Sequence, residues 1–157
     1  MLYRLYRPDD FPQLYAIEET CFKPPLRFSR RYMQQIINCK DSAAWIAEEN
    51  DRLTGFAVSD WANESEGTIA YVQTIEVAPE YRRQGIGSQL LQRCEDSAQS
   101  AGAILIWLHV DAQNGSALRL YRAHGYQQGG RREHYYARGR AAEIYVKPLQ
   151  SPAGTLP

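Results

Sequence analysis

The alternation of hydrophobic and polar residues along the chain predicts a series of β-strands. Six stretches alternate in this way or form short apolar runs, and glycine, proline or polar turns bound them. A polar turn at Asp51-Arg52 joins the second stretch to the third and so predicts a hairpin. The expected strands cover 2–7, 43–48, 53–61, 68–77, 104–110 and 141–146, with a further strand-like segment from Tyr126 onward.

Four other stretches carry apolar residues every three or four positions, which predicts amphipathic helices. The first helix should begin at Asp9 or Asp10, whose side chains favour N-caps, and end before Pro24, since proline cannot continue a helix. The later helices are expected to follow Ser29, to run from about Gly85 to Ala101, and to run from Asn114 to about His124.

The predicted order β-α-α-β-β-β-α-β-α-β-β indicates an α+β domain with a mixed sheet. The step from strand 68–77 through a helix to strand 104–110 is a βαβ crossover, which makes these two strands parallel. We expect one domain over residues 1–149. The polar tail at 150–157 contains proline and glycine, and we expect it to be disordered.

Composition narrows the class of protein. The chain has 157 residues, and its 18 basic and 18 acidic residues cancel, which does not favour general nucleic-acid binding. No stretch approaches the roughly 20 apolar residues of a membrane span. Three scattered cysteines fit neither a disulfide framework nor a metal site. We therefore expect a cytoplasmic protein with no metal, no nucleic-acid partner and no membrane anchor.

The segment V-A-P-E-Y-R-R-Q-G-I-G-S, residues 77–88, predicts a phosphate-binding turn. Gly85 and Gly87 stand at a helix start, where free backbone N–H groups and the helix dipole attract anions. The third glycine of a dinucleotide fingerprint is missing, and so is the G-K-[ST] of a nucleoside-triphosphate loop. On these residues alone, a flexible glycine turn with solvated arginines explains the segment equally well.

The turn R-R-Q-G-I-G after I-E-V-A-P-E-Y resembles the acetyl-CoA motif of the Gcn5-related N-acetyltransferases, the GNAT superfamily. The pattern N-x-x-A-x-x-L-Y-x-x-x-G-Y at 114–126 is similar to the second half of that family's sequence. The resemblance implies a central mixed sheet with a splayed parallel strand pair and flanking helices, and acetyl-CoA as cosubstrate. It assigns the cofactor to backbone or side-chain groups of Ile75, Val77, Arg82, Arg83, Gln84, Gly85, Gly87, Ser88 and Asn114.

The same resemblance identifies three residues with chemical roles. Tyr121 matches a tyrosine that stands near the thioester sulfur and often acts as general acid, although a tyrosine on an apolar helix face can also be plain core packing. Tyr71 and His109 resemble a tyrosine–histidine pair of NatE-type N-terminal acetyltransferases, which acts through ordered water. Relatives that acetylate ribosomal-protein alanine commonly carry glutamate at the position of His109.

Two alternatives remain for the base. His109 could be a core histidine with a satisfied hydrogen bond. Glu76 is a second candidate base, but regular strand alternation would place it on the face opposite Tyr71, Ile75 and Val77.

Two segments resemble the acceptor-binding parts of N-terminal acetyltransferases. The loop C-F-K-P-P-L-R-F-S supplies Phe22, Pro25 and Leu26, and the segment R-R-E-H-Y-Y supplies Tyr135 and Tyr136. The second match needs one extra residue, and Ala141-Ala142 replaces an acidic pair. The arginines of this segment fit an acidic-substrate patch and a solvated sheet edge equally well.

The residues and the resemblance together suggest an acetyl-CoA-dependent N-acetyltransferase that acts directly on a protein or peptide α-amine. A small-molecule amine or a lysine side chain is the alternative acceptor. A non-catalytic acyl-CoA-binding module is the alternative class of protein. Monomer and homodimer both stay open.

Overall fold

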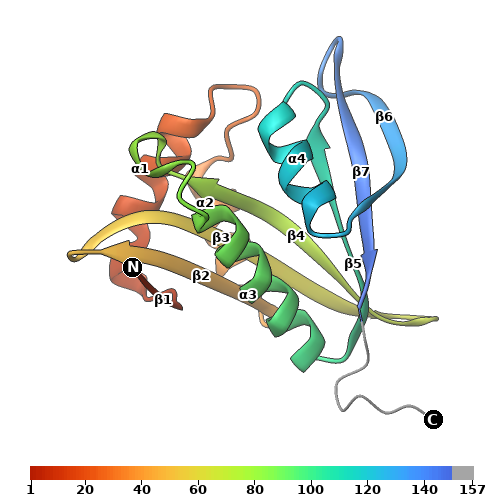
Figure 1. The fold of residues 1–157 in the computed structure, drawn as a ribbon, viewed down its shortest axis with the longest axis horizontal. Coiled ribbons are helices and arrows are strands. Elements are labelled where there is room, and N and C mark those ends of the chain that lie inside the picture. The colour runs from red at the N-terminus through yellow and green to blue at the C-terminus, as the bar shows by residue number, and fades with distance from the viewer. Residues whose placement is uncertain (150–157) are drawn as a thin grey trace.

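The structure, a computed structural model, describes residues 1–149, so the expectation for the tail lies outside the described residues (Figure 1). The observed order of helices and strands matches the predicted one, with two short 3-10 turns, Pro8–Asp10 and Pro79–Tyr81, in addition. The strands are β1 (Leu2–Leu5), β2 (Ser42–Glu49), β3 (Arg52–Glu64), β4 (Gly67–Val77), β5 (Ala103–Asp111), β6 (Gln127–Ala137) and β7 (Arg140–Pro148). The helices are α1 (Phe11–Cys21), α2 (Arg30–Ile37), α3 (Ile86–Ser100) and α4 (Gly115–Ala123).

The seven strands form one mixed sheet in the order β1-β2-β3-β4-β5-β7-β6. All neighbours are antiparallel except β4 and β5, which are parallel and joined through α3. The predicted mixed sheet and parallel crossover are therefore confirmed. Among residues 1–149, no helix is long and apolar enough to cross a membrane.

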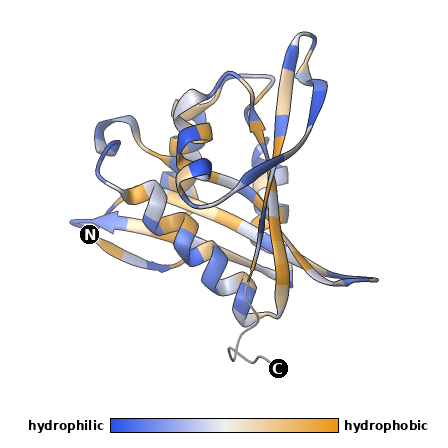
Figure 2. Ribbon diagram, turned by 45° about the vertical axis from the view of Figure 1, so that its right-hand side comes forward, coloured by the Kyte–Doolittle hydropathy of each residue, from blue (hydrophilic) through white to orange (hydrophobic). Residues whose placement is uncertain are grey.

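Helices cover both faces of the sheet. One core cluster joins α1 and α2 to even-numbered residues of β3, such as Phe56 and Val58. Two further clusters join α3 and α4 to the opposite face, where Ala57 of β3 and Leu108 of β5 point. Figure 2 shows the apolar colouring along the sheet and on the inner sides of the helices. Each face of the sheet therefore has its own apolar layer.

The start of α1 differs from the expectation. Asp10 is the N-cap residue by position, but its side chain makes no capping bond to the helix. Its carboxylate instead accepts the Arg4 guanidinium at 2.8 Å and the backbone N–H of Arg7 at 2.7 Å. The expected N-cap position at Asp10 is confirmed, but its carboxylate pairs with a guanidinium from β1 instead of capping the helix.

The parallel strands β4 and β5 pair over only part of their length. Their register ends at Val72 and Leu108. Beyond this point β4 continues alongside β3 to Val77, and β5 continues alongside β7 to Asp111. The two strands therefore separate, and their unpaired ends, 73–77 and 109–111, form the splay that the family resemblance implies.

A β-bulge in β4 changes which side chains share a face. Val58 of β3 pairs with Thr74, but the next residue, Ser59, pairs with Val72, so Gln73 is the extra residue of the bulge. Tyr71 pairs with Asp60, and Glu76 pairs with Phe56. Phe56 and Asp60 are four residues apart in β3 with no extra residue between them, so they share the α1/α2 face.

The expected position of Glu76 is therefore wrong. Glu76 lies on the same face as Tyr71, whereas Ile75 points to the opposite face and packs against Ile86 and Leu90 of α3. Regular alternation fails here because the bulge adds one residue between Tyr71 and Glu76.

Candidate active site

Tyr71 and His109 meet at the point where β4 and β5 separate. The Tyr71 hydroxyl lies 2.8 Å from Nδ1 of His109. Tyr71 precedes the last paired residue of β4, and His109 is the first residue of β5 beyond the pairing. The two side chains that the sequence predicts as partners are thus in direct contact, on the α1/α2 face of the sheet.

Three more aromatic rings enclose this pair. Tyr135 stacks on His109 at 4.4 Å between ring centroids with an interplanar angle of 11°. Trp107 packs against Tyr71 at 4.7 Å and against His109 at 5.1 Å. Tyr136 meets Tyr135 edge-on at 4.9 Å. The hairpin of β6 and β7 therefore places both predicted acceptor-binding tyrosines beside the pair.

The electrostatic surroundings keep both members of the pair neutral. Burial lowers the pKa of His109, and the nearby positive charge of Arg132 lowers it further. Burial raises the pKa of the Tyr71 phenol well above its ordinary value, and the phenol of Tyr135 adds to the shift. A neutral imidazole next to a neutral phenol can accept a proton, which is what a general base requires.

Tyr121 lies on the other face of the sheet. It projects from α4 into the core beneath α3 and α4, and only 7% of its surface is exposed. Burial raises the pKa of its phenol, and the thiol of Cys94 contributes. Tyr121 therefore stays a neutral hydrogen-bond donor. The candidate acid and the candidate base stand on opposite faces of the sheet, on either side of the splay.

The glycine turn has the geometry that its sequence predicts. Gly85 is the N-cap of α3 with a left-handed backbone of φ 80°, and residues 82–85 are exposed. The first helical hydrogen bond runs from Gln89 N to Gly85 O at 3.1 Å. The amides of residues 86–88 thus precede the helical ladder and can bind an anion.

A match to known proteins settles the family. Residues 11–126 match the model of the family described as "Acetyltransferase (GNAT) family". The chain belongs to the GNAT acetyltransferase family. The expected superfamily and the expected enzyme class, an N-acetyltransferase, are therefore confirmed.

Relatives of this GNAT chain include enzymes that modify protein N-termini. It is 28% identical over 130 residues to the ribosomal protein bS18 alanine N-acetyltransferase of Escherichia coli K12, covering 81% of each chain. It is 26% identical over 148 residues to N-alpha-acetyltransferase 50 of Danio rerio, covering 92% of this chain and 86% of the relative.

A solved structure confirms the fold. NAA60 of Arabidopsis thaliana in complex with a bisubstrate analogue superposes with a TM-score of 0.83 at 22% identity, covering 96% of this chain and 98% of that one. The predicted GNAT fold, with its splayed parallel pair, is thus confirmed.

Two predicted cofactor residues make contacts that their family match does not imply. The guanidinium of Arg82 donates to the carbonyl of Val77 at 3.1 Å and contacts Sγ of Cys21 at 3.3 Å, so it is turned towards α1. The backbone near Val77 is expected to contact the cofactor, and its carbonyl already accepts this bond from Arg82. Ile75 keeps its place in the splayed segment, beyond the last pair with β5.

Ser88 and Asn114 each connect the ends of helices. The Ser88 hydroxyl lies 3.0 Å from Nε2 of His124, which ties α3 to the end of α4. The Asn114 side chain accepts the N–H of Ala117 at 3.1 Å and so caps α4, the helix expected to start at this residue. The cofactor contacts of both residues stay predictions.

The predicted acceptor loop lies between α1 and α2, at the same end of the molecule as the tip of the β6–β7 hairpin (Figure 1). Phe22 and Leu26 are half-buried, and Pro25 is exposed. The backbone N–H of Phe28, at the end of this loop, donates to Oε2 of Glu18 at 2.9 Å. None of the interactions described for residues 1–149 joins Phe22, Pro25 or Leu26 to the Tyr71–His109 pair.

Glu76 is a poor candidate for an accessible base. Only 3% of its surface is exposed, and its Oε2 accepts the hydroxyl of Thr74 at 2.7 Å. Burial raises its pKa well above the ordinary value, and the neighbouring carboxyl of Glu18 raises it further. The surroundings therefore favour the protonated form of Glu76 and the neutral form of His109.

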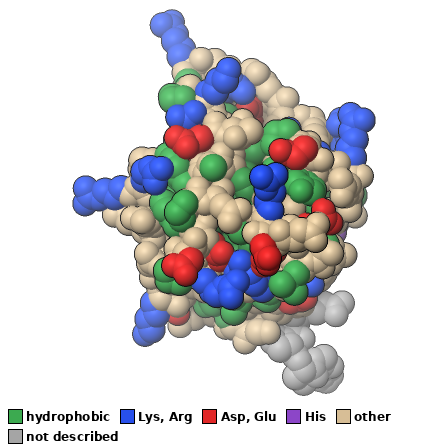
Figure 3. Space-filling view, turned by 90° about the vertical axis from the view of Figure 1, so that its left-hand side faces the viewer, with side chains coloured by type: hydrophobic (Ala, Val, Ile, Leu, Met, Phe, Trp, Pro, Cys, Tyr) green, Lys and Arg blue, Asp and Glu red, His purple; other side chains and the backbone are tan. Residues whose placement is uncertain are grey.

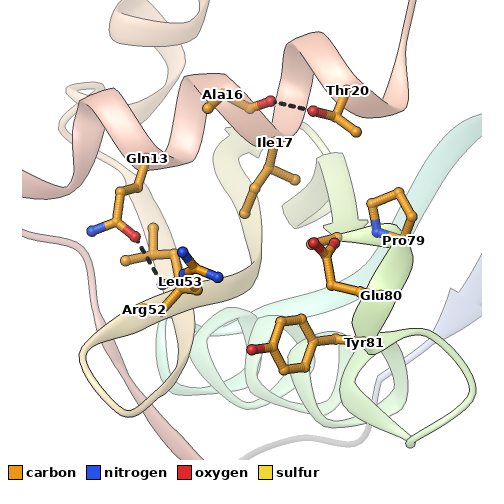
Figure 4. A pocket seen from close by; sticks show the side chains of 10 residues that line it. Gln13, Ala16, Ile17, Thr20, Arg52, Leu53, Pro79, Glu80 and Tyr81 are labelled. Atoms are coloured by element: carbon orange, nitrogen blue, oxygen red, sulfur yellow. Dashed lines mark hydrogen bonds between the residues drawn. The ribbon is translucent and has the colours of Figure 1, made fainter.

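A cavity of about 290 Å³ lies between α1, the start of β3 and the turn Pro79–Tyr81 (Figure 4). Its lining includes Ile17 and Leu53, and Gln13 there accepts the N–H of Leu53 at 3.1 Å. None of the predicted catalytic residues lines it. This cavity therefore contains no candidate catalytic group. In residues 1–149 no group of three or more His, Cys, Asp or Glu side chains is placed to hold a metal ion.

Three residues on the α1/α2 side of the sheet are absent from the sequence-based prediction of the site. Trp107 could have been found, because it stands two residues before His109 on the same strand and so shares its face. Glu18 carries a weaker signal, a charged residue four positions after Leu14 on the apolar face of α1. The hydroxyl of Tyr32 in α2 bonds the bulge residue Gln73 at 3.0 Å, and nothing in the sequence pairs these two.

Proposed function

We propose that this protein acetylates the α-amine of a protein or peptide N-terminus, with acetyl-CoA as the acetyl donor. The observation that carries the proposal is the Tyr71–His109 hydrogen bond of 2.8 Å at the mouth of the splay, enclosed by aromatic rings. The relatives named for ribosomal-protein alanine acetylation and as N-alpha-acetyltransferase 50 support this acceptor class.

The cofactor would bind on the α3/α4 side. The amides of residues 86–88 and the dipole of α3 would hold the pyrophosphate, with Arg83 beside the turn. The pantetheine arm would run along the unpaired end of β4 near Ile75. This course would bring the thioester into the splay, between Tyr121 and the Tyr71–His109 pair.

The transfer would be direct. An α-amine has an ordinary pKa of about 7.7–8.0, so a base of modest strength suffices to deliver it neutral. In the tautomer of His109 with an unprotonated Nδ1, the Tyr71 hydroxyl would donate to that nitrogen. The Tyr71 oxygen would then take up the amine proton, directly or through water, as its own proton passes to the imidazole. The new N–C bond forms as the C–S bond breaks, and the neutral phenol of Tyr121 donates a hydrogen bond to the departing thiolate.

The acceptor would approach from the α1/α2 face. Phe22, Pro25 and Leu26 would line one side of its path, and Tyr135 and Tyr136 the other. Arg132 adds positive potential near His109, which would favour acceptors with an acidic side chain close to the amine.

We further propose a cytoplasmic enzyme with no nucleic-acid partner and no membrane anchor. All three cysteines are free thiols, which suits a reducing compartment. On the face drawn in Figure 3, acidic and basic side chains are interspersed without an extended basic area.

The test is thiol release from acetyl-CoA across three acceptors: peptides with free N-termini, N-blocked peptides with a lysine, and polyamines. We expect turnover with free N-termini. Turnover on blocked peptides alone would overturn the acceptor class. Binding of acetyl-CoA with no turnover on any acceptor would indicate a non-catalytic acyl-CoA-binding module.

A further inference from the structure

Two buried carboxyl groups lie against each other beside the proposed acceptor path. Glu18 of α1 is 1% exposed and Glu76 of β4 is 3% exposed, and the Glu18 carboxyl lies close enough to Glu76 to raise its pKa. Within residues 1–149, the Oε1 atoms of Glu18 and Glu76 are both buried and have no hydrogen-bond partner. A buried oxygen without a donor costs free energy, and one proton held between the two carboxyl groups satisfies both atoms.

The Oε2 atoms connect this pair to two different segments. Oε2 of Glu18 accepts the backbone N–H of Phe28, the residue that ends the acceptor loop. Oε2 of Glu76 accepts the hydroxyl of Thr74, which follows the bulge in β4. With one proton between the two Oε1 atoms, the carboxyl pair would form a continuous hydrogen-bonded link from the loop to the strand that carries Tyr71.

The loop end that Glu18 binds also positions an aromatic side chain of the site. The Phe28 carbonyl accepts the hydroxyl of Tyr15 at 2.8 Å, and the Phe28 ring meets Tyr32 edge-on at 4.9 Å. The Tyr32 hydroxyl in turn bonds Gln73 at 3.0 Å. A displacement of Phe28 would therefore also displace Tyr32 and, through it, the bulge residue Gln73.

We propose that Glu18 and Glu76 are a positioning pair, which shares one proton and fastens the acceptor loop to β4. The inference rests on the proposed function in one respect: it takes the loop 22–29 to be the acceptor's path. The pair does not touch the reacting atoms. Its effect is on how well the acceptor binds, through the position of Phe28 and of the loop before it.

The charges around the pair make this link depend on pH. Burial is the main cause that raises the pKa of Glu76, followed by Glu18, while Thr74 and the positive charge of Arg82 oppose the shift. Cys21, also on α1, is the other titratable group nearby, and burial together with the Glu76 carboxyl raises the pKa of its thiol to about 11. Loss of the shared proton would leave two negative charges in contact, so the loop should loosen at alkaline pH.

The direction of this pH dependence follows from the linkage between proton binding and folding. A carboxyl group whose pKa is raised in the folded state contributes stability that is fully present below its unfolded pKa and is lost as the pH rises through the folded value. Stability and loop order should therefore both decline from acidic towards alkaline pH. Glutamine at position 76 can donate to Glu18 and accept from Thr74 without titrating, so E76Q should remove this decline.

The experiment compares wild type, E76Q, E18Q and the control E19Q from acidic to alkaline pH. Glu19 is the exposed neighbour of Glu18 on α1. The peptide KM, kcat and acetyl-CoA Kd are measured, together with hydrogen-exchange protection of residues 22–29. Exchange is measured without substrate, so it tests the pair even if the acceptor class is wrong.

We expect loop protection in wild type and E19Q to fall several-fold with rising pH, and peptide KM to rise more steeply than in E76Q. E76Q and E18Q should keep protection nearly constant, and acetyl-CoA Kd should be similar in all four proteins. Equal pH dependence of protection in wild type and E76Q would overturn the shared proton. The variants could instead differ in loop protection as expected while peptide KM has the same pH dependence in all four proteins. That result would overturn the acceptor-positioning role.

Discussion

His109 has a neutral ring because burial and the charge of Arg132 both lower its pKa. A base that is neutral at lower pH than ordinary histidine, with its pKa of about 6.5, stays active into mildly acidic solution. The Tyr71 hydroxyl occupies Nδ1, so proton uptake by His109 and the position of Tyr71 cannot be separated. The two residues should behave as one catalytic unit.

This coupling gives a prediction for variants of the pair. H109A and Y71F should each lower kcat/KM by roughly 10²-fold or more, the usual size of a general-base contribution. H109A should also remove the acidic limb of the wild-type pH–rate profile, whose midpoint should lie below the ordinary histidine pKa. Acetyl-CoA affinity should change little, as measured by calorimetry.

The double variant supplies the control for that prediction. Residues that act as a unit are strongly non-additive, so H109A/Y71F should be little slower than either single variant. Additive losses, or an acidic limb that persists in H109A, would return His109 to a structural role.

Individual residues also show which features of the site could be predicted from the sequence and which could not. Tyr71 and His109 could be paired in advance because the parallel crossover makes their strands neighbours. The face of the sheet on which Glu76 lies could not be predicted, because side chains alternate only in a regular strand and the bulge residue Gln73 interrupts β4. The contact of Arg82 with Val77 and Cys21 was equally hidden, since it joins segments far apart in the chain.

At the scale of elements, the start of α3 distinguishes its two glycines. Gly85 has φ 80°, and a Cβ there would meet nothing within 4 Å. A Cβ at Gly87 would make ordinary contacts with Leu120 at 3.5 Å and Val77 at 3.9 Å, so it would point into the protein. Backbone conformation therefore requires glycine at position 85 only.

We accordingly expect opposite results for two alanine variants. G85A should lose about 1 kcal/mol of stability, because alanine is strained in a left-handed backbone, and should bind acetyl-CoA more weakly. G87A should keep both properties close to wild type. Thermal unfolding and acetyl-CoA titration measure them, and equal losses in the two variants would contradict this account of the turn.

The helices and strands were predictable where their signals are local. The order of elements, the capping of α4 by Asn114 and the crossover all follow from residues close together in sequence. The ends of the strands were less predictable: β1 ends at Leu5 and not at Arg7, and β3 extends past the expected end at Trp61 to Glu64. Tertiary pairing with neighbouring strands decides those ends.

At the scale of the whole molecule, the splay lies between two faces of one sheet that carry different functional groups. The side of α3 and α4 carries the anion-binding turn and Tyr121, and the side of α1 and α2 carries Tyr71, His109 and the acceptor loop. The residues alone could not locate the separation of β4 and β5, because it depends on the register between strands. The resemblance to the GNAT family implied it, and the register confirms it.

The proposed acceptor, a protein or peptide α-amine, is tested most directly by competition between two amines of one peptide. A peptide with a free α-amine and one internal lysine is incubated with acetyl-CoA, and mass spectrometry locates the acetyl group. A version of the peptide with a blocked N-terminus is the control for the lower pKa of the α-amine. We predict acetylation at the α-amine of the free peptide and none of the blocked one, whereas acetyl-lysine in the blocked peptide at a comparable rate would contradict the account.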